Sequence, residues 1–183
     1  KAPRLIHRVY GYEASLGLMY QYATSFCGMK ENQDEYKFLG YEAHITECFD
    51  KADIRKLESH AVRILNNLLE LAEKNTAPIY GESGTIDTVK LNDIKEDWYH
   101  EFSEAIKDIN IKTDESFDSD FRHRVAIAFL IQNVIERYFI SLIEQYGMHN
   151  VVCAGGCFYN VKLNNTILTN TDGLFCTMPL AGD

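Results

Sequence analysis

Apolar side chains recur at helical spacing in four segments, and we expect a long helix in each of them. The segments span residues 13–28, 52–74, 93–106 and 118–146. A glycine closes the first segment and another directly follows the last, as is common where helices end. The pattern therefore predicts that helices dominate the first three quarters of the chain.

The gap between the second and third of these segments has the composition of a loop. Residues 76–92 contain Pro78, Gly81 and Gly84, three residues that favour turns and loops. We therefore expect a loop between the second and third helices.

The last part of the chain has a different pattern. Residues 151–154 form a short, bounded apolar run that is typical of a buried parallel strand, and residues 174–183 contain a second such run. A helix is expected between them, at about residues 158–168. The order strand, helix, strand predicts an α/β fold.

Gly155 and Gly156 follow the first predicted strand, and their chemistry suits a ligand. Neither glycine has a Cβ atom that would block close approach to the backbone. The helix that follows would direct its unpaired N–H groups and its positive dipole end at phosphate. Asn160 could add a contact through its amide. The alternative is that the glycine pair only forms a tight turn, because such pairs are common between elements.

The second predicted strand ends in Gly182 and Asp183. Ligands of open α/β sheets gather at the carboxyl ends of the strands, so Asp183 would lie beside the glycine turn. A carboxylate in that position is a candidate metal ligand. The alternative is an ordinary turn.

Five sequence blocks resemble one family. The blocks are Ser15-Leu16-Gly17-Leu18 with Tyr20, Glu35-Tyr36-Lys37 with Gly40, Ala126 with Gln132 and Glu136, Ala154-Gly155-Gly156 with Asn160, and Ala181-Gly182-Asp183. Their order and approximate spacing resemble those of the O-carbamoyltransferases of nodulation-factor and antibiotic biosynthesis. Residues 44–115 carry no comparable block.

The resemblance implies a fold. Such enzymes have a domain like that of the tRNA threonylcarbamoyl-transfer proteins, with the fold of actin, hexokinase and the heat-shock chaperone ATPases. Residues 1–183 would then be one partial actin-like ATPase domain. Residues 44–115 would be a mainly helical insertion, and residues 116–183 would supply the long helix, the nucleotide-binding strand, loop and helix, and the final strand. The chain begins with Lys1 and lacks the family's histidine pair, so we expect a segment excised from a longer enzyme.

The resemblance also implies a reaction. Carbamoyl phosphate and ATP would give a carbamoyl-adenylate, whose carbonyl is then attacked by a hydroxyl group of a small-molecule acceptor. Gly155, Gly156 and Asn160 would hold the nucleotide, and Asp183 would be one ligand of a divalent metal ion, with iron and magnesium as candidates. Lys37 could contact a phosphate or acyl group, or it could pair with Glu35 or a helix end. The segment alone would be inactive, and the remaining domains of the parent chain would complete the site.

Charge and composition narrow the choice of partners and location. The net charge is -9, and 18 basic residues are interspersed with 27 acidic ones, which argues against a nucleic-acid surface. No run of about 18 apolar residues occurs, so we expect no membrane span, and the cytoplasm is the expected location. Two alternatives remain open: a tRNA threonylcarbamoyl-transfer-like protein, and a non-enzymatic ATP-binding module of the same fold.

The cysteine pattern favours a role in core packing over a role in catalysis or metal binding. The chain has five cysteines, with no pair at C-x-x-C spacing, and we expect buried free thiols. Cys157, which directly follows Gly156, could be read as a nucleophile. No base that would activate it is visible nearby in the sequence, so we favour a packing role.

Overall fold

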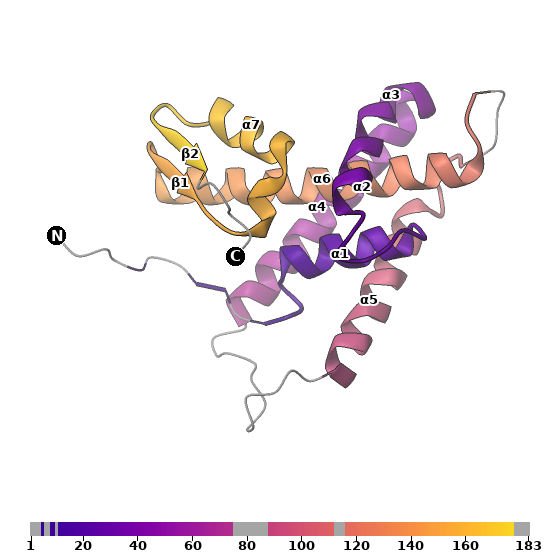
Figure 1. Cartoon of the computed structure of the whole chain (residues 1–183), viewed down its shortest axis with the longest axis horizontal. Coiled ribbons are helices and arrows are strands. Elements are labelled where there is room, and N and C mark those ends of the chain that lie inside the picture. Colours follow the sequence, from indigo (N-terminus) through magenta and orange to yellow (C-terminus); the bar gives the residue numbers. More distant parts are fainter. Residues whose placement is uncertain (1–4, 6–7, 10, 75–87, 112–115, 178–183) are drawn as a thin grey trace.

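A long central helix organises the structure (Figure 1). The computed structural model describes residues 5, 8–9, 11–74, 88–111 and 116–177. The elements in chain order are α1 (Leu16–Phe26), α2 (Glu35–Tyr41), the 3-10 helix η1 (Glu42–His44), α3 (Ile45–Cys48), α4 (Lys51–Lys74), α5 (Thr88–Ile106), α6 (Ser119–Tyr146), β1 (Val151–Cys153), the 3-10 helix η2 (Gly156–Tyr159), α7 (Val161–Thr169) and β2 (Phe175–Thr177).

Helix α6 has clear signals at both ends. The Asp118 side chain accepts a hydrogen bond from the Phe121 N–H at 2.7 Å, and Gly147 ends the helix in the left-handed conformation at φ 57°. Its middle turns, residues 125–132, are buried on every side. Helices α1, α2, α3, α4 and α7 all pack against it. By length and composition α6 could cross a membrane, but a buried core helix passes the same test, so the finding is weak evidence for a span.

The two strands form a small parallel sheet. Val151 pairs with Phe175, Val152 with Cys176 and Cys153 with Thr177. Parallel strands need a crossover connection, and here η2 and α7 supply it. The α/β prediction is therefore confirmed in its coarse form: the described chain is mostly helical, with one two-stranded parallel sheet.

The boundaries of two elements differ from the predictions. Helix α5 begins at Thr88, inside the predicted loop, because the residues that indicated the loop all precede residue 85. Helix α7 begins at Val161 and not near residue 158, because η2 occupies the three residues after Gly156. Within the described part of residues 44–115, most residues are helical, and α3, α4 and α5 account for them.

Candidate functional site

The glycine turn, which we define as residues 154–156, is open to solvent. Gly155 has φ 109° and ψ 161°, a conformation that is essentially restricted to glycine. A Cβ atom placed on Gly156 would meet no atom within 4 Å. All three residues of the turn are exposed. The turn therefore presents accessible backbone, as the sequence predicted.

Asn160 connects the glycine turn to the core. Its Oδ1 accepts a hydrogen bond from the Leu163 N–H at 3.0 Å and so caps α7. Its Nδ2 donates to Oε1 of Gln132 at 2.8 Å. Much of the amide is thus used inside the protein, which gives Asn160 a structural role beside the predicted ligand contact.

Gln132 lies on α6 with only 2% of its surface exposed. Its Nε2 donates to Oε1 of Glu136 at 2.5 Å, one turn further along the helix. A buried amide needs such partners, because an unpaired polar group in the core costs free energy. Three residues from two separate sequence blocks, Gln132, Glu136 and Asn160, therefore form one hydrogen-bonded network.

The first two sequence blocks also meet in space. Ser15 caps α1 by accepting from the Leu18 N–H at 3.3 Å. The Tyr20 ring packs edge-on against Phe38 of α2 with centroids 5.5 Å apart, and its hydroxyl donates to the Glu35 carbonyl at 3.5 Å. Helix α1 in turn packs against η2, beside the glycine turn.

The ammonium group of Lys37 forms an ion pair with a neighbouring side chain. Lys37 is exposed on α2, and its Nζ lies 2.6 Å from Oδ1 of Asp34. The hydrogen bond that Lys37 donates to the Asp34 carboxylate raises the pKa of Lys37 above its ordinary value. The expected partner was Glu35 or a helix end, and Asp34 is the residue that precedes α2. A contact with a ligand stays a prediction.

Lys162 is a second lysine, and sequence reasoning did not single it out. It lies in the first turn of α7, and its ammonium contacts the Glu42 carboxylate of η1. This ion pair joins the segment after α2 to the helix that follows the glycine turn. The only signal in the sequence was its position two residues after Asn160.

The described residues contain no group of three histidine, cysteine or acidic side chains placed to hold a metal ion. Asp183, the predicted metal ligand, lies outside the described residues. Cys157 is half-buried, and burial raises the pKa of its thiol, which disfavours the nucleophilic thiolate. All five cysteines are free. Cys27, Cys48 and Cys153 are buried, as predicted, whereas Cys157 is half-buried and Cys176 is exposed.

Comparison with known families decides the identity. The family model described as carbamoyltransferase N-terminus matches residues 1–183. The chain belongs to the carbamoyltransferase family. No curated protein and no solved structure gives a significant match. In this member of the carbamoyltransferase family, the block of Gln132 and Glu136 meets Asn160 at the N-terminus of α7, and α1 packs against η2 beside them.

Proposed function

We propose that the chain is part of an ATP-dependent O-carbamoyltransferase that uses carbamoyl phosphate as its carbamoyl donor. Carbamoyl phosphate, ATP and water would first give a carbamoyl-adenylate, with release of phosphate and pyrophosphate. A hydroxyl oxygen of a small-molecule acceptor then attacks the carbonyl carbon, and the bond from that carbon to the AMP oxygen breaks. The family match over residues 1–183 supports carbamoyl transfer in general.

The conformation and exposure of the glycine turn are the main support for nucleotide binding. Gly155 adopts a backbone conformation that other residues avoid, and the space beside Gly156 is empty. Backbone can approach a flat or anionic group there. The first turn of α7 adds N–H groups and the positive end of a helix dipole, both of which favour phosphate.

The roles of the residues follow from this placement. Gly155 and Gly156 lie against the nucleotide, and Asn160 fixes the start of α7 and can offer its remaining amide N–H. Asp183 provides one ligand of a divalent ion, iron or magnesium, which would act as a Lewis acid. Lys37 is retained as a candidate contact to a phosphate or acyl group. The actin-like architecture, the cytoplasmic location and the need for the remaining domains belong to the same proposal.

The test is ATP consumption by the full-length carbamoyltransferase with and without carbamoyl phosphate. We expect consumption to require carbamoyl phosphate, and to fall at least tenfold in Gly156→Val and Asp183→Ala. Gly156→Val fills the open space beside the turn with a branched side chain. Asp172→Ala, which removes an exposed carboxylate between α7 and β2, is the matched control and should keep wild-type activity.

Two results would contradict the proposal. Consumption that is indifferent to carbamoyl phosphate would indicate a plain ATPase module. Full activity in Gly156→Val would show that the glycine turn does not contact the nucleotide.

A further inference from the structure

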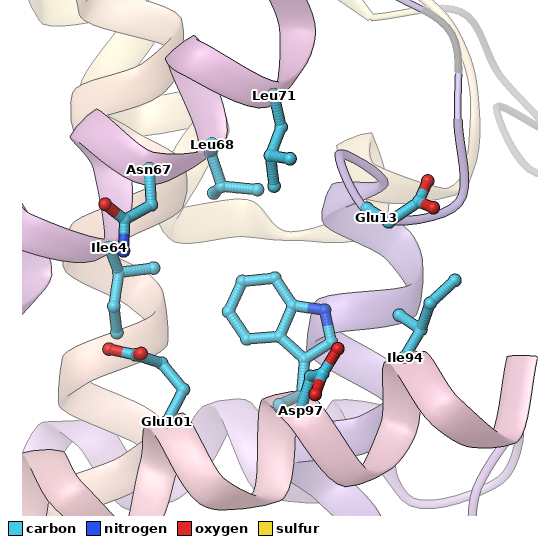
Figure 2. A pocket seen from close by; sticks show the side chains of 9 residues that line it. Glu13, Ile64, Asn67, Leu68, Leu71, Ile94, Asp97 and Glu101 are labelled. Atoms are coloured by element: carbon cyan, nitrogen blue, oxygen red, sulfur yellow. The ribbon is translucent and has the colours of Figure 1, made fainter. Parts of the chain in front are cut away.

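A second candidate site lies between α4 and α5, on helices that do not contribute to the glycine turn. A cavity of about 220 Å³ separates these helices (Figure 2). Figure 2 shows Ile64, Asn67, Leu68 and Leu71 entering from α4, opposite Ile94, Asp97 and Glu101 of α5. Glu13, on the segment that precedes α1, also lines the cavity.

The walls of the cavity are apolar. Five of its nine lining residues have large apolar side chains: Ile64, Leu68, Leu71, Ile94 and Trp98. The Trp98 ring is held in place by stacking on Phe102, with centroids 5.6 Å apart and an interplanar angle of 26°. Ligand cavities commonly combine such walls with a few convergent polar groups. Aromatic faces also attract cations.

The polar groups of the cavity are acidic. Glu13, Asp97 and Glu101 line it, and no lining residue is basic. Two of these carboxylates have cationic partners outside the lining: Lys90 lies 2.8 Å from Oε1 of Glu13, and Arg63 lies 2.5 Å from Oε1 of Glu101. The lining carboxylates and these two partners together leave a negative balance.

Glu13 provides the sharpest signal. Its Oε2 is shielded from solvent and has no hydrogen-bond partner among the described residues, although Oε1 is bonded to Lys90. Burial disfavours the charged form, but the hydrogen bond from Lys90, a backbone hydrogen bond and the positive charge of Lys90 together outweigh it and lower the pKa of Glu13. The carboxylate is therefore ionised at neutral pH. A shielded carboxylate oxygen without a partner would be stabilised by a hydrogen bond from an N–H donor.

We infer that this cavity binds a small organic ammonium ion with an apolar or aromatic body. The ammonium group donates to Glu13 and lies near Asp97, while the body contacts Trp98 and the leucine side chains of α4. A carboxylate or phosphate ligand would meet repulsion from all three acidic residues. The inference does not depend on the proposed transferase reaction.

Trp98 makes the inference directly testable, because it is the single tryptophan of the chain. Titration with 2-phenylethylammonium, followed by tryptophan fluorescence and by calorimetry, should show saturable binding with Kd on the order of 1 mM. The uncharged isostere 2-phenylethanol should bind about tenfold more weakly, since it lacks a charge-assisted hydrogen bond. The anion 3-phenylpropionate should not bind.

Variants locate the binding. Glu13→Gln and Asp97→Asn should each weaken binding of the ammonium ion by about fivefold or more and leave binding of the alcohol unchanged. Asp93→Asn is the matched control, because Asp93 is exposed on the same helix and does not line the cavity. Leu71→Phe should abolish binding of both compounds by filling the cavity.

Three outcomes would overturn the inference. These are absence of saturable binding, equal affinity for the ammonium ion and the alcohol, and equal losses in Asp97→Asn and Asp93→Asn. Far-UV circular dichroism of each variant shows whether it has folded. If Glu13→Gln does not fold, Asp97→Asn and Leu71→Phe still decide the question.

Discussion

The buried network of Gln132, Glu136 and Asn160 predicts a clear effect on stability. Gln132→Met keeps the length of the side chain and its helix propensity, but it removes every hydrogen bond of the amide. The Asn160 amide and the Glu136 carboxylate then lose their partner inside the protein. We expect the free energy of unfolding to fall.

The magnitude follows from the bonds that are lost. The bond from Asn160 Nδ2 to Gln132 Oε1, at 2.8 Å, joins two neutral groups and contributes about 1 kcal/mol. The bond from Gln132 Nε2 to the Glu136 carboxylate, at 2.5 Å, is charge-assisted and contributes about 1.5–3 kcal/mol. Asn160 and Glu136 are only half-buried, so water recovers part of this loss. The expected decrease is about 2–3 kcal/mol.

The assay is urea unfolding followed by circular dichroism. Asn133→Leu is the matched control, because Asn133 is adjacent on α6 and bonds only to the Phe129 carbonyl of its own helix, at 3.0 Å. The control should lose less than about 1 kcal/mol. Hydrogen exchange of the Leu163 amide should also accelerate in Gln132→Met, because its acceptor on Asn160 loses support. A decrease in Gln132→Met no larger than in the control would refute the reasoning.

Three further predictions concern other parts of the chain. Burial lowers the pKa of His123, so as the pH falls the unfolded chain takes up a proton at a higher pH than the folded chain does. The free energy of unfolding should therefore decrease as the pH drops below 6.5. Urea unfolding at pH 7 and pH 5 should show a weaker pH dependence in His123→Phe than in the wild type. Gly155→Ala should lose about 1–3 kcal/mol from the strain of φ 109°, whereas Gly156→Ala should stay within about 0.5 kcal/mol of wild type in the same assay. Gly173→Ala would place a Cβ atom 2.3 Å from the His149 carbonyl oxygen, so thermal unfolding should show a marked loss of stability; an unchanged midpoint would contradict that geometry.

The long helices could be predicted because their buried apolar residues recur at the spacing of an α-helix. The apolar stripe that begins after Asp118 has the helical spacing, and Gly147 gives the stop, so α6 was predicted almost to the residue. The short elements have no such period. Helix α2 has only seven residues, and η2 is a single 3-10 turn whose position depends on how Asn160 caps the next helix.

The candidate site was predictable in its backbone and less so in its side chains. The glycine pair and the position of Asn160 were evident from sequence, because glycine conformation and capping are local properties. The partners of Lys37 and Asn160 were not, since Asp34 and Gln132 compete with any ligand for them. Such competition depends on distances across the fold, which a pattern of residue types does not contain.

The network around Gln132 also bears on how the glycine turn can bind a ligand. Helix α6 is buried on all sides at that point, so Gln132 cannot move without opening the core. Asn160 is bonded to it and at the same time caps α7, so the start of α7 is tied to the buried central helix. Gly155 and Gly156 of the turn stay exposed and have no side chains. If the proposed nucleotide binds beside the turn, this fixed start of α7 lowers the entropic cost of ordering the backbone that contacts it.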